Sequence, residues 1–109
     1  MTSPTPEIRK VGVVGAGQMG NGIAHVCAVA GYDVLVTDVS QDALDRAVAL
    51  IDKNLTRQVT RDMIDEASKA AAMKRIVTTS KLSDLGQTDL IIEAATERDR
   101  FLMFTTFLT

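Results

Sequence analysis

The sequence contains little cysteine and no long apolar run. Its single cysteine among 109 residues, Cys27, cannot form a disulfide within the chain, which excludes a disulfide-stapled scaffold and favours a reducing compartment, the cytoplasm. No segment approaches the run of about 18 apolar residues that crosses a bilayer, so the pattern does not indicate membrane insertion. Histidine, cysteine and carboxylate residues do not cluster at metal-ligand spacing, so we expect no metal site.

Positive charge is also scarce. The chain carries 12 Lys and Arg against 14 Asp and Glu, and this net charge of −2 gives no electrostatic reason to expect nucleic acid or an anionic membrane as partner. A small dissolved ligand is the expected partner. With 46% hydrophobic and 24% charged residues, the composition fits one globular domain. Residues 1–8 are polar and contain both prolines, which predicts a disordered leader.

The first 30 residues after this leader have the pattern of a strand, a helix and a second strand. Val11 to Val14 is a β-branched run that ends at a glycine, typical of a central strand. Apolar residues then recur at helical spacing up to Gly31, which has the position of a left-handed cap. Tyr32 to Thr37 predicts the second strand. Such a unit is almost always right-handed, so the two strands should be parallel. The predicted inner face of this helix consists of Met19, Ile23, Val26, Cys27 and Ala30.

A helical hairpin is predicted next, followed by two further strands. Ser40 has the position of an N-cap for one helix, and Asp65 has that position for a shorter, alanine-rich helix. Short β-branched runs predict a third strand at 76–79 and a fourth at 89–95, joined by a loop around 83–86. The predicted buried residues are Leu44, Ala47, Val48, Ile51 and Leu55 on the first helix and Ala67, Ala70 and Ala71 on the second.

Strands that alternate with helices predict an α/β fold, a Rossmann-type doubly wound parallel sheet of which this chain holds the first four strands. If the strand order is 3-2-1-4, the carboxyl ends of the first and fourth strands frame the crevice where ligands bind. The glycines after the first strand would line one side of this crevice. The other side would be lined by Ala94, Ala95, Thr96 and Glu97.

A GxGxxG motif follows the first strand, and its residues are Gly15, Ala16, Gly17, Gln18, Met19 and Gly20. In this context the first glycine permits a tight turn, the second leaves room for a pyrophosphate and the third lets the helix pack on the strand. The amino terminus of the helix would offer free N–H groups and about half a positive charge to phosphates. The motif alone is weak, because such glycines also serve any tight strand-to-helix turn.

An acidic residue at the end of the second strand strengthens the dinucleotide interpretation. Asp38 lies 21 residues after Gly17 and can accept both hydrogen bonds of an adenosine ribose diol. Each charge-assisted bond contributes about 1.5–3 kcal/mol, so losing one predicts that NAD is preferred over NADP by roughly one to two orders of magnitude. The alternative is a turn of glycines with an aspartate that caps a helix.

Four other side chains are weaker candidates. His25, the only histidine, lies off the predicted inner face and is expected to be solvated or to support other residues rather than act as a base. Cys27 is expected to be buried and inert. Glu93 interrupts an apolar strand, and it either has a functional role beside the crevice or forms a structural contact with another side chain. Glu97 either contacts the cofactor or caps a helix.

Three segments together resemble the 3-hydroxyacyl-CoA dehydrogenases, and among them the bacterial enzymes that act on 3-hydroxybutyryl-CoA. The segments read "KVGVVGAGQMGNGIAHVCAVAGYDVLVTDVS", "LIDKNL" and "DLIIEAATE", within a resemblance that runs from Arg9 to Arg98. The glycine turn, the aspartate, the helical hairpin and the last segment are together far more specific than GxGxxG alone. We therefore expect a partial NAD-binding domain over residues 9–98.

The resemblance implies NAD-dependent interconversion of 3-hydroxyacyl-CoA and 3-oxoacyl-CoA in fatty-acid or butanoate metabolism. Residues 15–20 would hold the pyrophosphate and Asp38 the adenosine ribose, with Ala94, Ala95 and Glu97 beside the nicotinamide. The family's catalytic histidine and the glutamate that orients it lie in later "SNTSS" and "HFFNP" regions, which this chain does not contain. The resemblance thus implies that the CoA thioester and a homodimer require a further domain, and that this chain alone is inactive.

The last eleven residues, "DRFLMFTTFLT" at 99–109, depart from the family pattern. The family continues there with a charged helix that carries a cofactor-contacting lysine, and Leu102 has approximately that position. The segment from Phe101 onward has no charge and no proline, which predicts that it needs a partner surface or promotes aggregation.

Two other functions remain open: a non-catalytic or degenerate NAD-binding protein, and another NAD-dependent 3-hydroxy acid dehydrogenase.

Overall fold

The computed structural model describes residues 7–94 and the backbone of residues 102–104. In chain order its elements are β1 (Lys10–Val14), α1 (Gln18–Ala30), β2 (Asp33–Thr37), α2 (Gln41–Thr60), α3 (Glu66–Arg75), β3 (Ile76–Thr79), the 3₁₀ helix η1 (Leu82–Gln87), β4 (Leu90–Glu93) and β5 (Leu102–Phe104). None of the helices in these described ranges is both long and apolar enough to cross a membrane.

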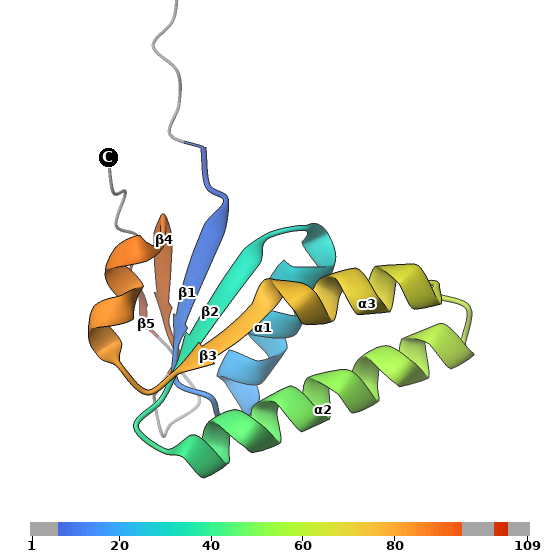
Figure 1. Cartoon of the computed structure of the whole chain (residues 1–109), viewed down its shortest axis with the longest axis horizontal. Helices are drawn as coiled ribbons and strands as arrows, with labels where there is room; N and C mark the ends of the chain where they lie inside the picture. Colours follow the sequence, from blue (N-terminus) through green and yellow to red (C-terminus); the bar gives the residue numbers. More distant parts are fainter. Residues whose placement is uncertain (1–6, 95–101, 105–109) are drawn as a thin grey trace, which may run out of the picture.

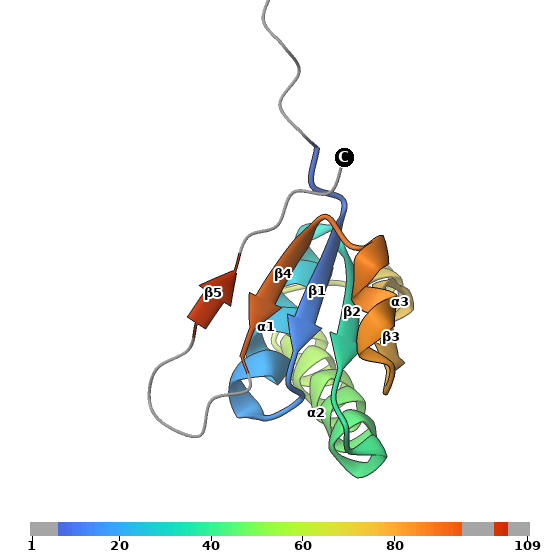
Figure 2. The same cartoon turned by 90° about the vertical axis from the view of Figure 1, so that its left-hand side faces the viewer.

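The sheet has the strand order β3-β2-β1-β4-β5, as Figures 1 and 2 show. Strands β1 to β4 are parallel, which confirms the predicted α/β class and the predicted order 3-2-1-4. The fifth strand was not predicted: β5 lies antiparallel to β4, with Met103 opposite Ile92. The predicted loop around 83–86 is the 3₁₀ helix η1.

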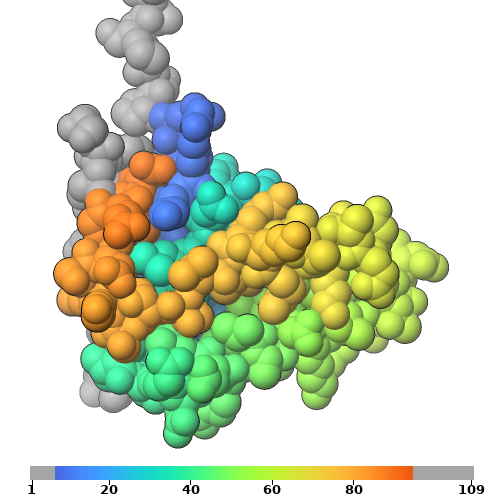
Figure 3. All heavy atoms as spheres, in the orientation of Figure 1, coloured from blue at the N-terminus to red at the C-terminus, as the bar shows by residue number. Residues whose placement is uncertain are grey.

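One face of the sheet is covered by α1 and by the hairpin of α2 and α3, which buries the main hydrophobic core. Alternate strand residues such as Val13 and Val36 meet the predicted stripe of α2, of which Leu44, Ala47, Ile51 and Leu55 are buried. On the other face, η1 places Leu85 over Gly12, where an added Cβ would approach the leucine side chain to 2.7 Å. The hairpin extends past the sheet as one arm (Figure 3).

Local signals at the helix ends behave as predicted. Ser40 Oγ accepts a hydrogen bond from the Ala43 N–H at 3.1 Å, and Asp65 accepts one from the Ser68 N–H at 2.7 Å. Gly31 ends α1 with a φ of 108°, in the left-handed region that favours glycine. Ser40 and Asp65 thus fix the starts of the two helices in the hairpin that separates β2 from β3, and Gly31 fixes the end of α1.

The predicted inner face of α1 is partly wrong, and that of α3 is wrong. Of the predicted α1 residues, Met19, Ile23 and Cys27 are half-buried and pack against the core, whereas Val26 and Ala30 are exposed. The fully buried residues of α1 are Gly20, Asn21, Ala24 and Ala28, because the helix lies so close to the sheet that small residues fit best at the contact. In α3 only Ala72 is buried, while Ala67 and Ala70 are exposed, because the first turns of α3 lie in the arm beyond the sheet.

Candidate functional site

The glycine turn after β1 has the geometry that its motif predicts. Gly15 adopts a φ of 103° and donates its N–H to Thr37 O of β2 at 2.8 Å, which anchors the turn to the neighbouring strand. A Cβ on Gly20 would lie 1.8 Å from Gly15 O, so a larger residue would displace α1. The structure thus confirms that the first glycine permits the turn and that the third permits close helix packing.

The amino terminus of α1 opens onto free space. Gly17 is its N-cap residue, no side chain caps it, and an added Cβ would meet nothing within 4 Å. With Gln18 it lines a pocket of about 450 Å³ whose other wall comes from α2. Among the residues that the structure describes, Arg46 is the only charged one that lines this pocket. Free N–H groups, a positive helix end and one arginine make this pocket suited to an anion.

Asp38 ties the glycine turn to the start of α2. Its Oδ2 accepts the Ala16 N–H at 2.8 Å, and its Oδ1 accepts the Ser40 N–H at 2.9 Å. The sequence predicts that this carboxylate binds a ribose, and neither of these two bonds is among its predicted contacts. Asp38 is also not the helix cap of the alternative interpretation, because Ser40 is the N-cap of α2. A carboxylate offers about four acceptor positions, so roughly two remain for a ligand.

An apolar pocket of about 180 Å³ adjoins Asp38, at the carboxyl ends of β1, β2 and β3. Val39 and Leu82 line it and are 97% and 64% exposed. Neither residue is among those that the sequence predicted for the site. The available signal was an apolar side chain placed directly after a strand-end acid, which folding alone does not explain. A flat apolar ring placed between these side chains would remove both from water.

The opposite wall of the crevice is described only as far as Ala94. This residue is buried, and its N–H donates to Val14 O at 2.8 Å, which places the end of β4 beside the glycine turn. The other residues predicted to line the crevice, Ala95, Thr96 and Glu97, lie outside the described residues. Glu93 is half-buried and stands opposite Val14 in the strand register.

The other two candidates on α1 lie away from the glycine turn. His25 is half-buried, with Nε2 3.2 Å from Gln58 Oε1 of α2, so it contacts the hairpin rather than the crevice. Cys27 is half-buried instead of fully buried, and desolvation raises the pKa of its thiol. A raised pKa leaves little thiolate at neutral pH, in keeping with the expected lack of reactivity.

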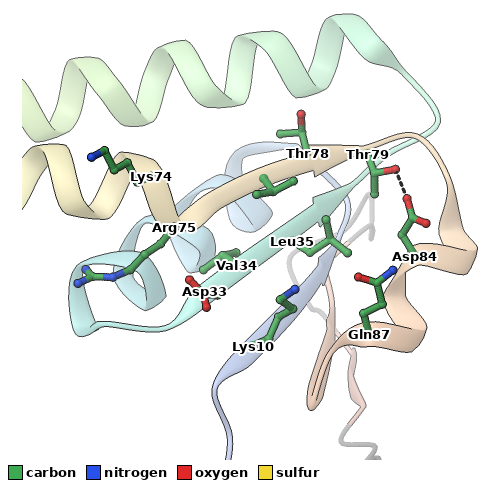
Figure 4. Close-up of a pocket in the computed structure, with 11 residues that line it drawn as sticks. Lys10, Asp33, Val34, Leu35, Lys74, Arg75, Thr78, Thr79, Asp84 and Gln87 are labelled. Carbon is green, nitrogen blue, oxygen red and sulfur yellow. Dashed lines mark hydrogen bonds between the residues drawn. The ribbon is translucent and has the colours of Figure 1, made fainter.

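A larger pocket of about 460 Å³ lies over β2 and β3 on the face that α1 does not cover (Figure 4). Its wall is polar, and Thr79 Oγ1 donates to Asp84 Oδ2 there at 2.6 Å. Among the residues that the structure describes, no three metal-ligating side chains gather in this pocket or elsewhere. None of the predicted site residues lines this pocket, so the crevice at the glycine turn is the better candidate site.

The comparisons with known proteins agree with this geometry. The model of the 3-hydroxyacyl-CoA dehydrogenase NAD-binding domain matches residues 10–101. The chain belongs to this family. A 3-hydroxybutyryl-CoA dehydrogenase of Bradyrhizobium diazoefficiens is 54% identical over 92 residues, which cover 84% of this chain and 31% of that protein. A 3-hydroxyadipyl-CoA dehydrogenase of Escherichia coli is 40% identical over 84% of this chain and 19% of its own length.

Solved structures lead to the same family. An (S)-3-hydroxybutyryl-CoA dehydrogenase from Ralstonia eutropha superposes with a TM-score of 0.81 at 47% identity, over 84% of this chain and 32% of the other. This NAD-binding domain therefore spans about a third of the length of such relatives. NAD is the cofactor of the family, and the described residues have the open glycine turn and the strand-end acid that a dinucleotide requires.

Proposed function

We propose that this chain is the cofactor-binding part of an oxidoreductase that interconverts 3-hydroxyacyl-CoA and 3-oxoacyl-CoA, for example 3-hydroxybutyryl-CoA and acetoacetyl-CoA. The observation that carries the proposal is the juxtaposition of the open Gly17 turn with the Asp38 carboxylate, which is bonded to Ala16 of that same turn. The names of the relatives supply the substrate class.

Different residues of the crevice bind different parts of the dinucleotide. The N–H groups at the start of α1 and the open space over Gly17 accept the pyrophosphate. The unused acceptor positions of Asp38 bind the adenosine ribose diol and exclude a 2′-phosphate. Val39 and Leu82 enclose the adenine ring. Bound NAD⁺ supplies the acceptor for a hydride from the substrate C3.

Catalysis in the complete enzyme needs a base that these 109 residues do not supply. Ala94, Ala95 and Glu97 of this chain lie beside the nicotinamide. A histidine from the further part of the enzyme, oriented by a glutamate, removes the substrate hydroxyl proton. Without that base the isolated chain binds NAD and does not turn over. For the longer protein, the proposal includes a CoA thioester as substrate and assembly as a homodimer. It also places that protein in the cytoplasm, in fatty-acid or butanoate metabolism.

Calorimetric titration of the chain with NAD and with NADP tests the proposal. We expect NAD to bind about 10 to 100 times more tightly, because NADP loses at least one ribose hydrogen bond at Asp38. Asp45→Asn, at an exposed carboxylate of α2, is the control and should leave the preference unchanged. Failure to bind NAD, or equal affinity for NADP, would contradict the proposal.

A second candidate is a non-catalytic NAD-binding protein. It is favoured by β5, because Leu102 stands opposite Glu93 in the strand register where the family pattern has a charged helix with a cofactor-contacting lysine. The intact mass of the natural gene product separates the candidates. A mass near 11.7 kDa favours the non-catalytic protein, and a much larger mass favours the enzyme. For the larger product, comparing turnover of CoA thioesters and free acids would identify another 3-hydroxy acid dehydrogenase.

A further inference from the structure

Two helices enclose the pocket of about 450 Å³ beside the glycine turn. Gly17 and Gln18 supply the amino terminus of α1, which no side chain caps. From α2, Arg46 brings a positive charge to the same pocket. Asp38 lines a different pocket, together with Val39. The arginine therefore lies at the part of the crevice that suits the phosphates of a dinucleotide, whereas the acid lies at the part that suits the ribose.

A buried hydrogen bond holds this part of α2 against α1. Asn21, which is only 5% exposed, donates its Nδ2 to Ala47 O at 2.8 Å. Ala47 is itself buried and directly follows Arg46. Asn21 also donates its N–H to Gly17 O at 2.9 Å, one turn earlier in α1. The backbone that carries Arg46 thus has a fixed position relative to the open amino terminus of α1.

The guanidinium of Arg46 is suited to reach a ligand in this pocket. Its Nε donates to Asp42 O, one turn earlier in α2, at 3.3 Å. This bond directs the side chain toward the start of α2, which Asp38 ties to the glycine turn. The two terminal nitrogens carry the remaining N–H donors, in the planar arrangement that matches two phosphate oxygens. The residue is exposed, so a dissolved ligand has access to these donors.

We propose that Arg46 binds the pyrophosphate of NAD, opposite the N–H groups at the start of α1. The inference rests on the proposed function, because it assigns one more residue to the same cofactor site. The pyrophosphate is dianionic, whereas the start of α1 offers it only about half a positive charge. Arg46 adds a full positive charge and a pair of donors. It also offsets the repulsion between the pyrophosphate and the nearby Asp38 carboxylate.

The 2′-phosphate of NADP is the other anion that an arginine near this site could bind. That phosphate would lie on the ribose beside Asp38, and Arg46 lines the pocket of Gly17 and Gln18 instead. The carboxylate of Asp38 would also repel a phosphate at that position. The pyrophosphate is therefore the anion that the arrangement favours.

Calorimetric titration of the full 109-residue chain with NAD and with NADP tests the inference. Arg46→Gln should weaken NAD binding about fivefold to tenfold, a loss between that of an exposed ion pair and that of a buried charged hydrogen bond. Arg46→Lys should recover part of this loss, because lysine keeps the charge without the planar pair of donors. Arg57→Gln is the matched control, since Arg57 is exposed on the same helix and does not line the pocket. It should change NAD affinity less than about twofold.

Two further measurements separate a direct contact from an indirect effect. Raising the salt concentration should weaken NAD binding more in the unchanged chain than in Arg46→Gln, because salt screens the charge that the variant lacks. Thermal unfolding without cofactor should give the same Tm for both, because glutamine is a good helix former and the position is exposed. A lower Tm for Arg46→Gln would contradict the exposed placement on which the inference depends.

Each contrary binding result overturns the inference. Unchanged NAD affinity in Arg46→Gln would mean that the arginine is only solvated, and an equal loss in Arg57→Gln would mean a general effect of charge. A loss of NADP affinity alone would assign Arg46 to the 2′-phosphate. A chain that does not bind NAD would overturn the proposed function as well, whereas an unchanged Arg46→Gln variant leaves that function intact.

Discussion

Replacing Asp38 by asparagine should destabilise the protein even without cofactor. The carboxylate accepts the N–H groups of Ala16 and Ser40 at 2.8 and 2.9 Å, and asparagine has only one acceptor oxygen. One of the two N–H groups therefore loses its partner. A hydrogen bond to a charged acceptor contributes about 1.5–3 kcal/mol, so we expect the free energy of unfolding to fall by roughly 2 kcal/mol. For a domain of this size, that lowers Tm by roughly 8–16 °C.

Thermal unfolding followed by circular dichroism, with and without NAD, measures both roles of Asp38. Saturating NAD should raise the Tm of the unchanged chain and raise that of Asp38→Asn much less, because the ribose also loses an acceptor. Asp45→Asn removes the same charge from an exposed carboxylate that accepts a hydrogen bond from exposed Gln41, so it should change stability by less than about 0.5 kcal/mol. A cofactor-free Asp38→Asn chain with unchanged Tm would refute the reasoning.

Three further predictions follow from single contacts. Gly20→Ala should lower the free energy of unfolding, measured by chemical denaturation, by at least about 2 kcal/mol and abolish NAD binding, because the added Cβ would lie 1.8 Å from Gly15 O. Gly22→Ala is the control, since its Cβ meets nothing within 4 Å, and it should leave stability unchanged or raise it. Hydrogen bonds from the backbone N–H groups of Arg9 and Lys10 lower the pKa of Asp89. The stabilising effect of this carboxylate is therefore present above about pH 4 and is lost as the pH falls through the lower folded pKa. Urea titrations of Asp89→Asn across pH 2 to 6 should show a shallower acid loss, and an unchanged slope would argue against this contact. The raised pKa of the Cys27 thiol predicts slower reaction with a disulfide reagent at pH 8 than that of an unfolded control in urea, and equal rates would contradict it.

The strand order and helix caps could be predicted because their signals are local. A β-branched run before glycine, a serine or aspartate before a helical stripe, and a glycine after one each act within a few residues. The right-handed crossover rule then makes the first two strands parallel, and the order 3-2-1-4 is that of a dinucleotide-binding sheet, to which the glycine motif points. For this reason Gly31, Ser40 and Asp65 have the roles that the sequence predicted.

The inner face of α1 could not be predicted from hydrophobicity alone. The distance between helix and sheet decides it, and that distance is set by the backbone contact at Gly20. A close contact selects glycine and alanine over valine and isoleucine. The same limit explains α3, where the length of the hairpin arm, rather than the spacing of alanines, determines which residue is buried.

The candidate site was predicted in part. Its glycines and Asp38 follow from their spacing, since each performs its role within its own turn. Val39 and Leu82 were missed because they come from segments more than 40 residues apart that meet only after β2 and β3 pair. The bond that Asp38 accepts from the Ala16 N–H was missed for the same reason, because Ala16 approaches it only in the folded sheet. The bond from the Ser40 N–H is local, and an aspartate two residues before a helix N-cap was the signal that could have predicted it.

The antiparallel pairing of β5 has a consequence for attempts at fragment complementation. In a doubly wound sheet the strand that follows β4 is added parallel at the edge of β4. In this chain residues 102–104 already pair with that edge. A separately expressed fragment that carries the remaining strands of a relative would first have to displace them, whereas a chain shortened to residue 98 would present a free edge and should accept such a fragment more readily.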